Sequence, residues 1–354
     1  MKVYIDARLS WRSGIGRFVA SVVPFVVQRR PKWGFRIAIA PTNDHPVLTE
    51  LERLPNVELA VTDCAPFSLK EQTSLEAIAK GCDISWFTNY WVPFVWRTPF
   101  IATIHDLLHL QPRLFPTSVA NRILSRLAFQ KLARRAEGLM FVSRFTHREF
   151  VDRFGSPRRS TIVHHGVDAG RFAAAGDKTK MLLVVSALKS HKNLEMLVNT
   201  WKQAQVSAEW RLMIVHPGDT LRSSIWRDGI PQIVNATIAG GVTDDELASL
   251  YSSAALFLFP SKYEGFGLPL LEAASSGCRI LSSTAPALIE TAEGMQVWHI
   301  DAYDAEGWRL AIEKHCREFD RLGQFPETAA NAEIASRVTW TAAANSIIAF
   351  LESL

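Results

Sequence analysis

Short apolar runs and longer amphipathic stretches alternate along the whole chain, and this alternation limits the fold more than any other feature of the sequence. In the first half, runs rich in apolar and β-branched residues lie at 2–7, 35–40, 100–106, 138–143 and 160–167. The stretch 121–138, NRILSRLAFQKLARRAEG, has the apolar spacing of an amphipathic helix. Strands that alternate with helices form parallel sheets covered by helices. The sequence therefore predicts an α/β protein with doubly wound, Rossmann-like sheets.

The alternation is interrupted once, at the polar and small-residue segment 171–180, and then starts again. The second set of runs lies at 181–188, 210–217, 232–241, 254–261 and 278–283. A length of 354 residues also fits two domains. We expect an N-terminal domain over 1–172, a linker near 172–178, a second domain over 178–338, and a terminal helix over 339–354. Doubly wound domains in tandem bind ligands in the cleft between them, at the carboxyl ends of the strands.

The composition argues against membrane-spanning and secreted classes. The longest apolar stretch, 18–27, is half of the roughly 20 residues that a membrane span needs, and it contains Pro24. The first ten residues, MKVYIDARLS, lack the apolar core of a signal peptide. The four cysteines show no disulfide or zinc spacing. These features lead us to expect a protein of the reducing cytoplasm.

The charge is uneven along the chain. Residues 1–175 hold 24 Lys and Arg against 14 Asp and Glu, whereas the remainder holds 15 against 21. A basic N-terminal half can meet an acidic partner, a membrane surface or nucleic acid, and it can also be an ordinary solvated surface.

A glycine turn follows the first predicted strand and opens a helix at SGIGRFVASVV. Gly14 and Gly16 allow backbone amides to approach a phosphate or a sugar closely, with a helix N-terminus behind them. The dinucleotide fingerprint G-x-G-x-x-G/A fails here because Val19 stands at its last position. A plain helix-starting turn is the alternative.

Histidines follow two of the predicted strands. His105 and Asp106 come directly after the apolar run that begins at residue 100. His105 is either a structural hydrogen bonder or a functional group at a strand end. His109 lies four residues on, but no third metal ligand accompanies the two histidines. The pair His164 and His165, placed on a predicted strand, would point to opposite faces and could not easily chelate one ion.

The second half contains a basic turn before a helix that we expect to begin near Asn193. Lys189 and Lys192 flank this turn, so a cationic side chain and helix amides could converge on an anion. Two solvated lysines are the simpler interpretation.

The most informative run is SKYEGFGLPLLEA, residues 261–273. It follows an apolar strand, and Pro269 suits the first turn of a helix that ends at Gly277. This interpretation places Glu264 in the loop and Glu272 in the first turn of the helix. The amides of Phe266, Gly267 and Leu268 would form an anion-binding nest between the two acids.

The extended run PSKYEGFGLPLLEAASSG resembles the E-x7-E motif of the retaining, nucleotide-sugar-dependent glycosyltransferases of family 4. Other segments are similar to motifs of the same family: SGIGRF, IHDL, FVSRFTHREF, HHGVD, KSHKNL, AGGVTDDELASLY and SSTAPALIE. The resemblance covers nearly the whole chain. It implies the GT-B architecture, in which two Rossmann-like domains face each other across a cleft and the terminal helix crosses back onto the N-terminal domain.

The resemblance also implies roles for individual residues in donor binding. Glu272 would bind the ribose hydroxyls and Glu264 the hydroxyls of the donor sugar near the reacting carbon. Lys192 would neutralise the diphosphate leaving group together with the amides of Phe266, Gly267 and Leu268. The glycine loop, Gly14 and Gly16, would bring backbone to the phosphates.

Two further roles follow from the resemblance, and two positions depart from it. His105 would hydrogen-bond the sugar, and Val242 would border the base. Many relatives have an arginine where this chain has Ala187, and Lys189 could replace it. His165 stands where the family pattern has asparagine, and the sequence does not reveal the consequence.

The chemistry of glycosyl transfer agrees with this division of roles. Charge builds on the leaving phosphates while the sugar becomes oxocarbenium-like, so charge stabilisation there matters most. The chain has no D-x-D triplet, and we expect Lys192 and backbone amides to act without a metal. Retention could use a carboxylate nucleophile, Glu264 or Asp106. The resemblance instead implies front-face attack by the acceptor.

The basic N-terminal half also offers a candidate membrane surface. The amphipathic stretch 121–138 carries five cations among its apolar residues: Arg122, Arg126, Lys131, Arg134 and Arg135. Three aromatic residues precede it in the sequence: Trp91, Phe94 and Trp96. Such a surface suits peripheral docking to anionic lipid at the inner face of the cytoplasmic membrane. A core-facing helix with a solvated back is the alternative.

The sequence thus predicts a metal-independent hexosyltransferase, with GDP-mannose as the first donor to test. The expected partners are a nucleotide sugar, a glycan or lipid-linked acceptor of surface polysaccharide synthesis, and an anionic membrane, with no nucleic acid. Two alternatives are a sugar-nucleotide epimerase of the same architecture and a non-catalytic protein that binds sugar nucleotides or glycans.

Overall fold

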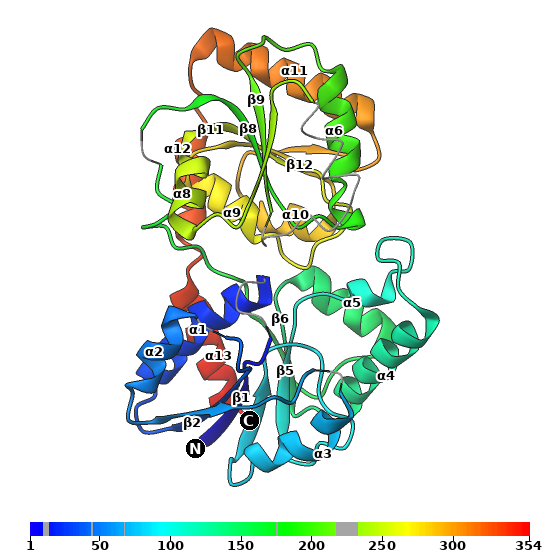
Figure 1. Ribbon diagram of the computed structural model, residues 1–354, viewed down its shortest axis with the longest axis vertical. Helices are drawn as coiled ribbons and strands as arrows, with labels where there is room; N and C mark the ends of the chain where they lie inside the picture. Colours follow the sequence, from blue (N-terminus) through cyan, green and yellow to red (C-terminus); the bar gives the residue numbers. More distant parts are fainter. Residues whose placement is uncertain (10–13, 44, 67, 175, 217–232) are drawn as a thin grey trace. The chain divides into compact units, whose positions relative to one another are not determined.

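The computed structural model describes residues 1–9, 14–43, 45–66, 68–174, 176–216 and 233–354, which form two compact units (Figure 1). Unit 1 comprises Met1–His165 and Trp340–Leu354, and unit 2 comprises Gly166–Thr339. The chain enters unit 2 earlier than at the polar segment 172–178. This segment is tied into unit 2 because Lys178 Nζ donates to the carbonyls of Tyr251 and Ser276, at 3.1 and 2.6 Å.

Unit 1 contains a seven-stranded sheet in the order β3-β2-β1-β4-β5-β6-β7, and every neighbouring pair is parallel. The strands are β1 (Lys2–Asp6), β2 (Gly34–Ile39), β3 (Val57–Val61), β4 (Ile84–Phe87), β5 (Phe100–Ile104), β6 (Gly138–Phe141) and β7 (Ser160–Ile162). The strand order reverses between β1 and β4, and such a switch point is where doubly wound sheets bind ligands. The predicted fold class is confirmed.

The helices of unit 1 connect these strands and include the end of the chain. They are α1 (Gly14–Arg29), α2 (Pro46–Glu52), α3 (Leu69–Ile78), α4 (Val119–Arg135), α5 (Arg144–Phe154) and α13 (Trp340–Glu352), with a short 3-10 turn at Leu108–Leu110. The last helix, α13, packs against α1 and β7. Its Phe350 lies over Gly138, where an added Cβ would come within 2.4 Å of the ring. An ion pair between Arg30 and Glu352 adds a polar contact.

Unit 2 repeats the same plan with six parallel strands in the order β10-β9-β8-β11-β12-β13. The strands are β8 (Thr179–Val185), β9 (Arg211–His216), β10 (Ala236–Gly240), β11 (Ala254–Phe259), β12 (Arg279–Ser283) and β13 (Trp298–Ile300). The helices are α6 (Leu194–Gln203), α8 (Asp244–Ser253), α9 (Leu268–Ser275), α10 (Pro286–Thr291), α11 (Ala305–Leu322) and α12 (Thr328–Ser336), and a 3-10 turn spans Ser190–Lys192. The switch point lies between β8 and β11. The ends of two predicted strands, Pro217 and Gln232, lie outside the described residues.

The predicted strand 160–167 is shorter in the structure and ends at Ile162. The reason is that β7 is an edge strand whose single neighbour, β6, ends at Phe141 opposite Ile162. His164 and His165 therefore lie beyond the strand rather than on it.

The prediction of a membrane-docking surface is wrong for three of its residues, Trp91, Trp96 and Lys131. Trp91 and Trp96 are buried in unit 1, at 4% and 1% exposure, and cannot reach a bilayer. Lys131 is also buried, because its ammonium donates to the carbonyl of Pro93 and lies over the ring of Phe100. Burial lowers the pKa of Lys131 to about 8. Of the predicted surface, half-buried Phe94 and the exposed face of α4 remain accessible.

Candidate functional site

The switch point of unit 2 brings the basic turn and the acidic loop together. The basic turn follows β8 and the acidic loop follows β11, and these strands are neighbours in the sheet. Three contacts join the two segments. Asn193, in a left-handed conformation with φ of 59°, donates from Nδ2 to the carbonyl of Pro260 at 3.2 Å. The amide of Lys262 donates to the carbonyl of His191 at 2.7 Å, so the turn and the loop hold each other in place.

The third contact is an ion pair between the two predicted site residues. Lys192 Nζ lies 2.6 Å from Glu264 Oε1, and the side chains are 17% and 11% exposed. An ammonium has three donors and a carboxylate has two oxygens. Both groups can therefore contact a ligand while the pair persists.

The positive charge of this turn comes from its lysines and not from its histidine. His191 is buried, and burial together with Lys192 and Lys189 lowers its pKa to about 3. A histidine in this state is neutral near pH 7. Lys189 is exposed, and its amide donates to the carbonyl of Ala187 at 2.9 Å.

Gly267 fixes the start of α9. Its φ of 114° is unfavourable for other residues, and an added Cβ would lie 2.4 Å from Leu288 Cδ2. The peptide before it is anchored because Thr291 Oγ1 donates to the carbonyl of Phe266 at 2.7 Å. The first amides of a helix lack intrahelical acceptors and carry partial positive charge. In α9 the second residue, Pro269, has no N–H, and the amide of Leu270 donates to the carbonyl of Gly267 at 2.9 Å. Leu268 is therefore the residue of the first turn whose amide could contact an anion.

Glu272 does not lie in the first turn of α9, contrary to the prediction. With Gly267 as the N-cap, the helix begins at Leu268, one residue before Pro269, and its first turn contains no acid. Glu272 is the fifth helical residue and is only 2% exposed. Its burial is not explained by a favourable position at the helix end.

Val242 lies just after β10, beside Gly241, which has φ of 66°. The side chain of Val242 is half-buried. The turn therefore occupies another strand end of the same sheet.

In unit 1, His105 follows β5 as predicted and is 9% exposed. Its Nε2 lies 2.9 Å from the carbonyl of Thr88. Because a carbonyl only accepts, Nε2 carries the proton, and in the neutral ring Nδ1 is an acceptor. Burial lowers the pKa of His105, which favours the neutral ring. His105 can therefore accept a hydrogen bond from a hydroxyl group.

A buried polar network supports Thr88 and was not found by the sequence analysis. The hydroxyl of Thr88 donates to the carbonyl of Asp6 at 2.7 Å. The carboxylate of Asp6 binds Arg8, which also pairs with Glu71, and Trp91 donates to Glu71 at 2.7 Å. Asp6 and Thr88 mark the ends of β1 and β4, so the switch point itself was the signal that could have identified them.

Gly14 and Gly16 lie in α1 rather than in the loop before it. Gly14 is the first residue of the helix and Gly16 the third, and Gly16 is buried. The preceding residues 10–13, which include Ser13 of the predicted loop, lie outside the described part of the chain.

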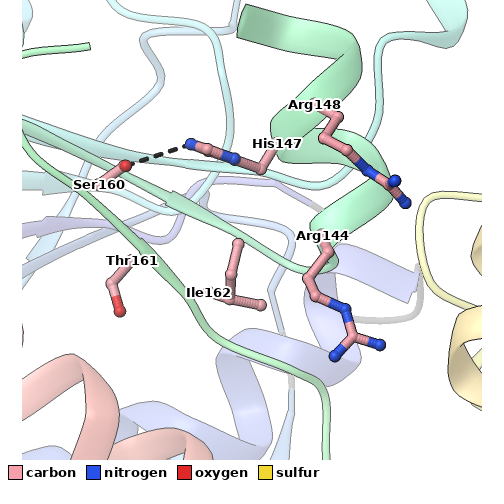
Figure 2. A pocket seen from close by; sticks show the side chains of 6 residues that line it. All are labelled: Arg144, His147, Arg148, Ser160, Thr161 and Ile162. Atoms are coloured by element: carbon pink, nitrogen blue, oxygen red, sulfur yellow. Dashed lines mark hydrogen bonds between the residues drawn. The ribbon is translucent and has the colours of Figure 1, made fainter. Parts of the chain in front are cut away.

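A separate hollow of unit 1 lies between α5 and β7 (Figure 2). It is lined by Arg144, His147, Arg148, Ser160, Thr161 and Ile162, and none of these is a predicted site residue. His147 Nε2 lies 3.3 Å from Ser160 Oγ. His105 is not among the residues that line this hollow.

The described residues contain neither a metal-binding cluster nor a membrane-spanning helix. Within these ranges, no group of three or more His, Cys, Asp and Glu side chains could hold a metal ion. No helix of the described chain has both the length and the apolar character of a membrane span.

Comparison with known proteins gives two family matches, one in each half of the chain. Residues 19–171 match the model described as Glycosyltransferase Family 4, and residues 179–318 match Glycosyl transferases group 1. Among solved structures, a sucrose-phosphate synthase from Thermosynechococcus elongatus superposes with a TM-score of 0.81 at 16% identity, covering 100% of this chain and 98% of that one. HepE from Anabaena, in complex with UDP-glucose, has a TM-score of 0.76 at 16% identity and full coverage of both chains.

Relatives in sequence include mannosyltransferases. The MMP alpha-(1->4)-mannosyltransferase of Mycolicibacterium hassiacum is 28% identical over 201 residues, 55% of this chain and 44% of that protein. The O-antigen chain mannosyltransferase RfbU of Salmonella typhimurium is 23% identical over 228 residues, 63% of this chain and 62% of that protein. The chain thus spans less than two thirds of the length of either relative. The solved structures, at 16% identity, agree in fold alone, whereas the two family models together match residues 19–171 and 179–318 and show that the chain belongs to glycosyltransferase family 4.

Proposed function

We propose that the protein is a retaining glycosyltransferase that moves a hexose from a nucleotide diphosphate sugar to a glycan or lipid-linked glycan during synthesis of a surface polysaccharide. The observation that carries the proposal is the pairing of Lys192 with Glu264 at the switch point of unit 2, beside the N-terminus of α9. The named mannosyltransferases among the relatives make GDP-mannose the first donor to test.

In the proposed reaction, each element acts on a different part of the donor. Lys192 and the amides at the start of α9 stabilise the diphosphate as it leaves, where most charge develops. Glu264 binds hydroxyls of the sugar, Glu272 binds the ribose, and Val242 borders the base. His105, through Nδ1, accepts a hydrogen bond from a sugar hydroxyl, and the start of α1 at Gly14 and Gly16 approaches the phosphates.

The deciding experiment combines thermal shift with a transfer assay. A donor at 100 times its Kd stabilises a protein by about 2.7 kcal/mol. We expect GDP-mannose to raise Tm and to support mannosyl transfer to an acceptor glycan, with UDP-glucose as the matched comparison. Lys192→Met should abolish the shift. If no nucleotide sugar raises Tm, the donor site is not where we place it.

We also propose that the leaving diphosphate is neutralised without a metal ion. Lys192 and the α9 amides then supply the charge stabilisation that Mg²⁺ supplies in other transferases. The rate in excess EDTA is expected to equal the rate in Mg²⁺ within about twofold. Loss of turnover in EDTA that Mg²⁺ restores would contradict this proposal.

Finally, we infer that the exposed face of α4 docks on anionic lipid. Val119, Ile123 and Leu127 are 61%, 55% and 47% exposed and lie four residues apart, so they form one stripe. Arg126 is exposed on the same helix, and Arg134 and Arg135 are exposed near its end. Apolar residues among cations suit an interfacial helix.

The lipid proposal predicts co-sedimentation with phosphatidylglycerol vesicles that weakens as salt is raised. Ile123→Glu should reduce the bound fraction at least about tenfold, because it places a charge in the apolar stripe. Leu310→Glu on α11 of unit 2 is the matched control, since Leu310 is 50% exposed. Equal loss in both variants, or no binding at low salt, would rule out docking through α4.

A further inference from the structure

His105 is held by aromatic rings as well as by the carbonyl of Thr88. The ring of Phe18 meets the His105 ring edge-on, with centroids 5.2 Å apart and an interplanar angle of 82°. The ring of His165 lies 5.5 Å from His105 at 58°. His165 is itself buried, with 8% exposure.

A tryptophan supports His165. The centroid of Trp340 lies 5.7 Å from that of His165 at 33°, and 6.3 Å from that of Phe18. Phe18 and His165 are also in contact, at 5.3 Å. Phe18 of α1 and His165 after β7 therefore contact the His105 ring, and Trp340, the first residue of α13, supports them from behind.

We propose that His165 is a positioning residue that holds the His105 imidazole with Nε2 on the carbonyl of Thr88 and Nδ1 available to a sugar hydroxyl. This inference rests on the proposed glycosyl transfer and adds a residue to it. Rotation about the bond to an imidazole ring has no sharp minima, so one hydrogen bond does not fix the ring. Packing in an aromatic pair contributes stabilisation of the same order as a net hydrogen bond. Removing the His165 ring therefore removes a comparable share of the restraint.

Burial favours the neutral form of both histidines. Burial is the main reason that the pKa of His105 is lowered, while the contact with Thr88 and the charge of Asp106 oppose the shift. Burial also lowers the pKa of His165 well below its usual value, with smaller effects of His105 and His164. The neighbouring helices α1 and α13 contribute Phe18 and Trp340 to the cluster. Protonation of His105 would remove Nδ1 as an acceptor. If the cluster is broken and His105 becomes solvated, its pKa should rise, so the enzyme should lose activity at a higher pH than the wild type does.

The test compares His165→Ala, which removes the ring, with His165→Phe, which keeps an aromatic ring. We expect the alanine variant to lose about 10- to 100-fold in kcat, as misplaced catalytic groups do, with the donor KM within about twofold. In the pH–rate profile of the alanine variant, the fall in activity on the acid side should move up toward pH 6.5, because His105 becomes solvated. The phenylalanine variant should keep the acid limb and most of kcat. His165→Asn is a second variant without the ring, for use if the alanine variant does not fold.

Imidazole ¹⁵N NMR tests the same inference without any substrate. The wild-type spectrum should show His105 protonated at Nε2 alone, and His165→Ala should show mixed tautomers. The inference would be overturned if His165→Ala had the same kcat, the same acid limb of the pH–rate profile and the same ring-nitrogen chemical shifts as the wild type. Absence of transfer by the wild-type protein would instead contradict the proposed function and leave the NMR result to decide on His165.

Discussion

Replacing Glu264 with glutamine is expected to lower kcat/KM for sugar transfer by about 10²- to 10³-fold, the loss typical of removing one group that stabilises developing charge. The substitution keeps the size of the side chain and its location in the loop after β11. It removes the negative charge that faces Lys192 at 2.6 Å and changes the hydrogen bonding that the proposal assigns to the donor sugar. Steady-state kinetics over a range of donor concentrations measures the effect.

A double-mutant cycle with Lys192→Met separates the two roles. If both residues act on one bound donor, the combined loss should be smaller than the product of the single losses, since coupled residues are not additive. Glu333→Gln is the matched control because Glu333 pairs with Arg337 at 2.7 Å but is 70% exposed on α12. A Glu264→Gln enzyme with full turnover and an unchanged melting curve would remove Glu264 from the mechanism.

Replacing Gly267 with alanine is expected to destabilise the protein by about 2–5 kcal/mol and to abolish measurable donor binding. The positive φ contributes about 1–2 kcal/mol of this cost. The collision of the new Cβ with Leu288 adds about 1–3 kcal/mol. Movement of the backbone to relieve the collision would also displace the first amides of α9. Denaturant unfolding and donor titration measure the two effects.

Gly323→Ala is the control for the backbone cost. Gly323 has φ of 72° and nothing within 4 Å of an added Cβ, so only about 1–2 kcal/mol should be lost there. Combining Gly267→Ala with Leu288→Ala should recover donor binding in part, because it removes the atoms that collide. Equal stability losses at Gly267 and Gly323 would show that the contact with Leu288 does not constrain the site.

Much of the fold could be predicted because strand and helix periods are local properties of the sequence. The strands with continuous apolar runs, such as β5 and β11, are buried along their whole length and are easily identified. The alternation gives little sign of β3, whose edge position leaves two of its five residues exposed. It gives equally little sign of β4, which has only four residues.

The contact between candidate residues was predictable where they follow neighbouring strands, and it was not predictable where a cluster depends on distant segments. Glu264 and Lys192 could be named because each follows a recognisable strand, and parallel strands end at the same edge of the sheet. The consequence of His165 could not be predicted, because Phe18 and Trp340 come from opposite ends of the chain. The exposure of Lys131 was predicted wrongly, because an amphipathic pattern does not show that a buried acceptor, the carbonyl of Pro93, is available to its ammonium group.

The return of α13 to unit 1 has a consequence for synthesis on the ribosome. Unit 1 includes residues 1–165 but is complete only with Trp340–Leu354, which is translated after all of unit 2. All of unit 2 therefore leaves the ribosome before Phe350 can cover Gly138 or Trp340 can reach His165. Unit 2, with a continuous chain, can finish folding first. The ring that packs against His165 and Phe18 is therefore added only after unit 2 has been translated, so a chain that stops before Trp340 would lack this support even with every predicted site residue present.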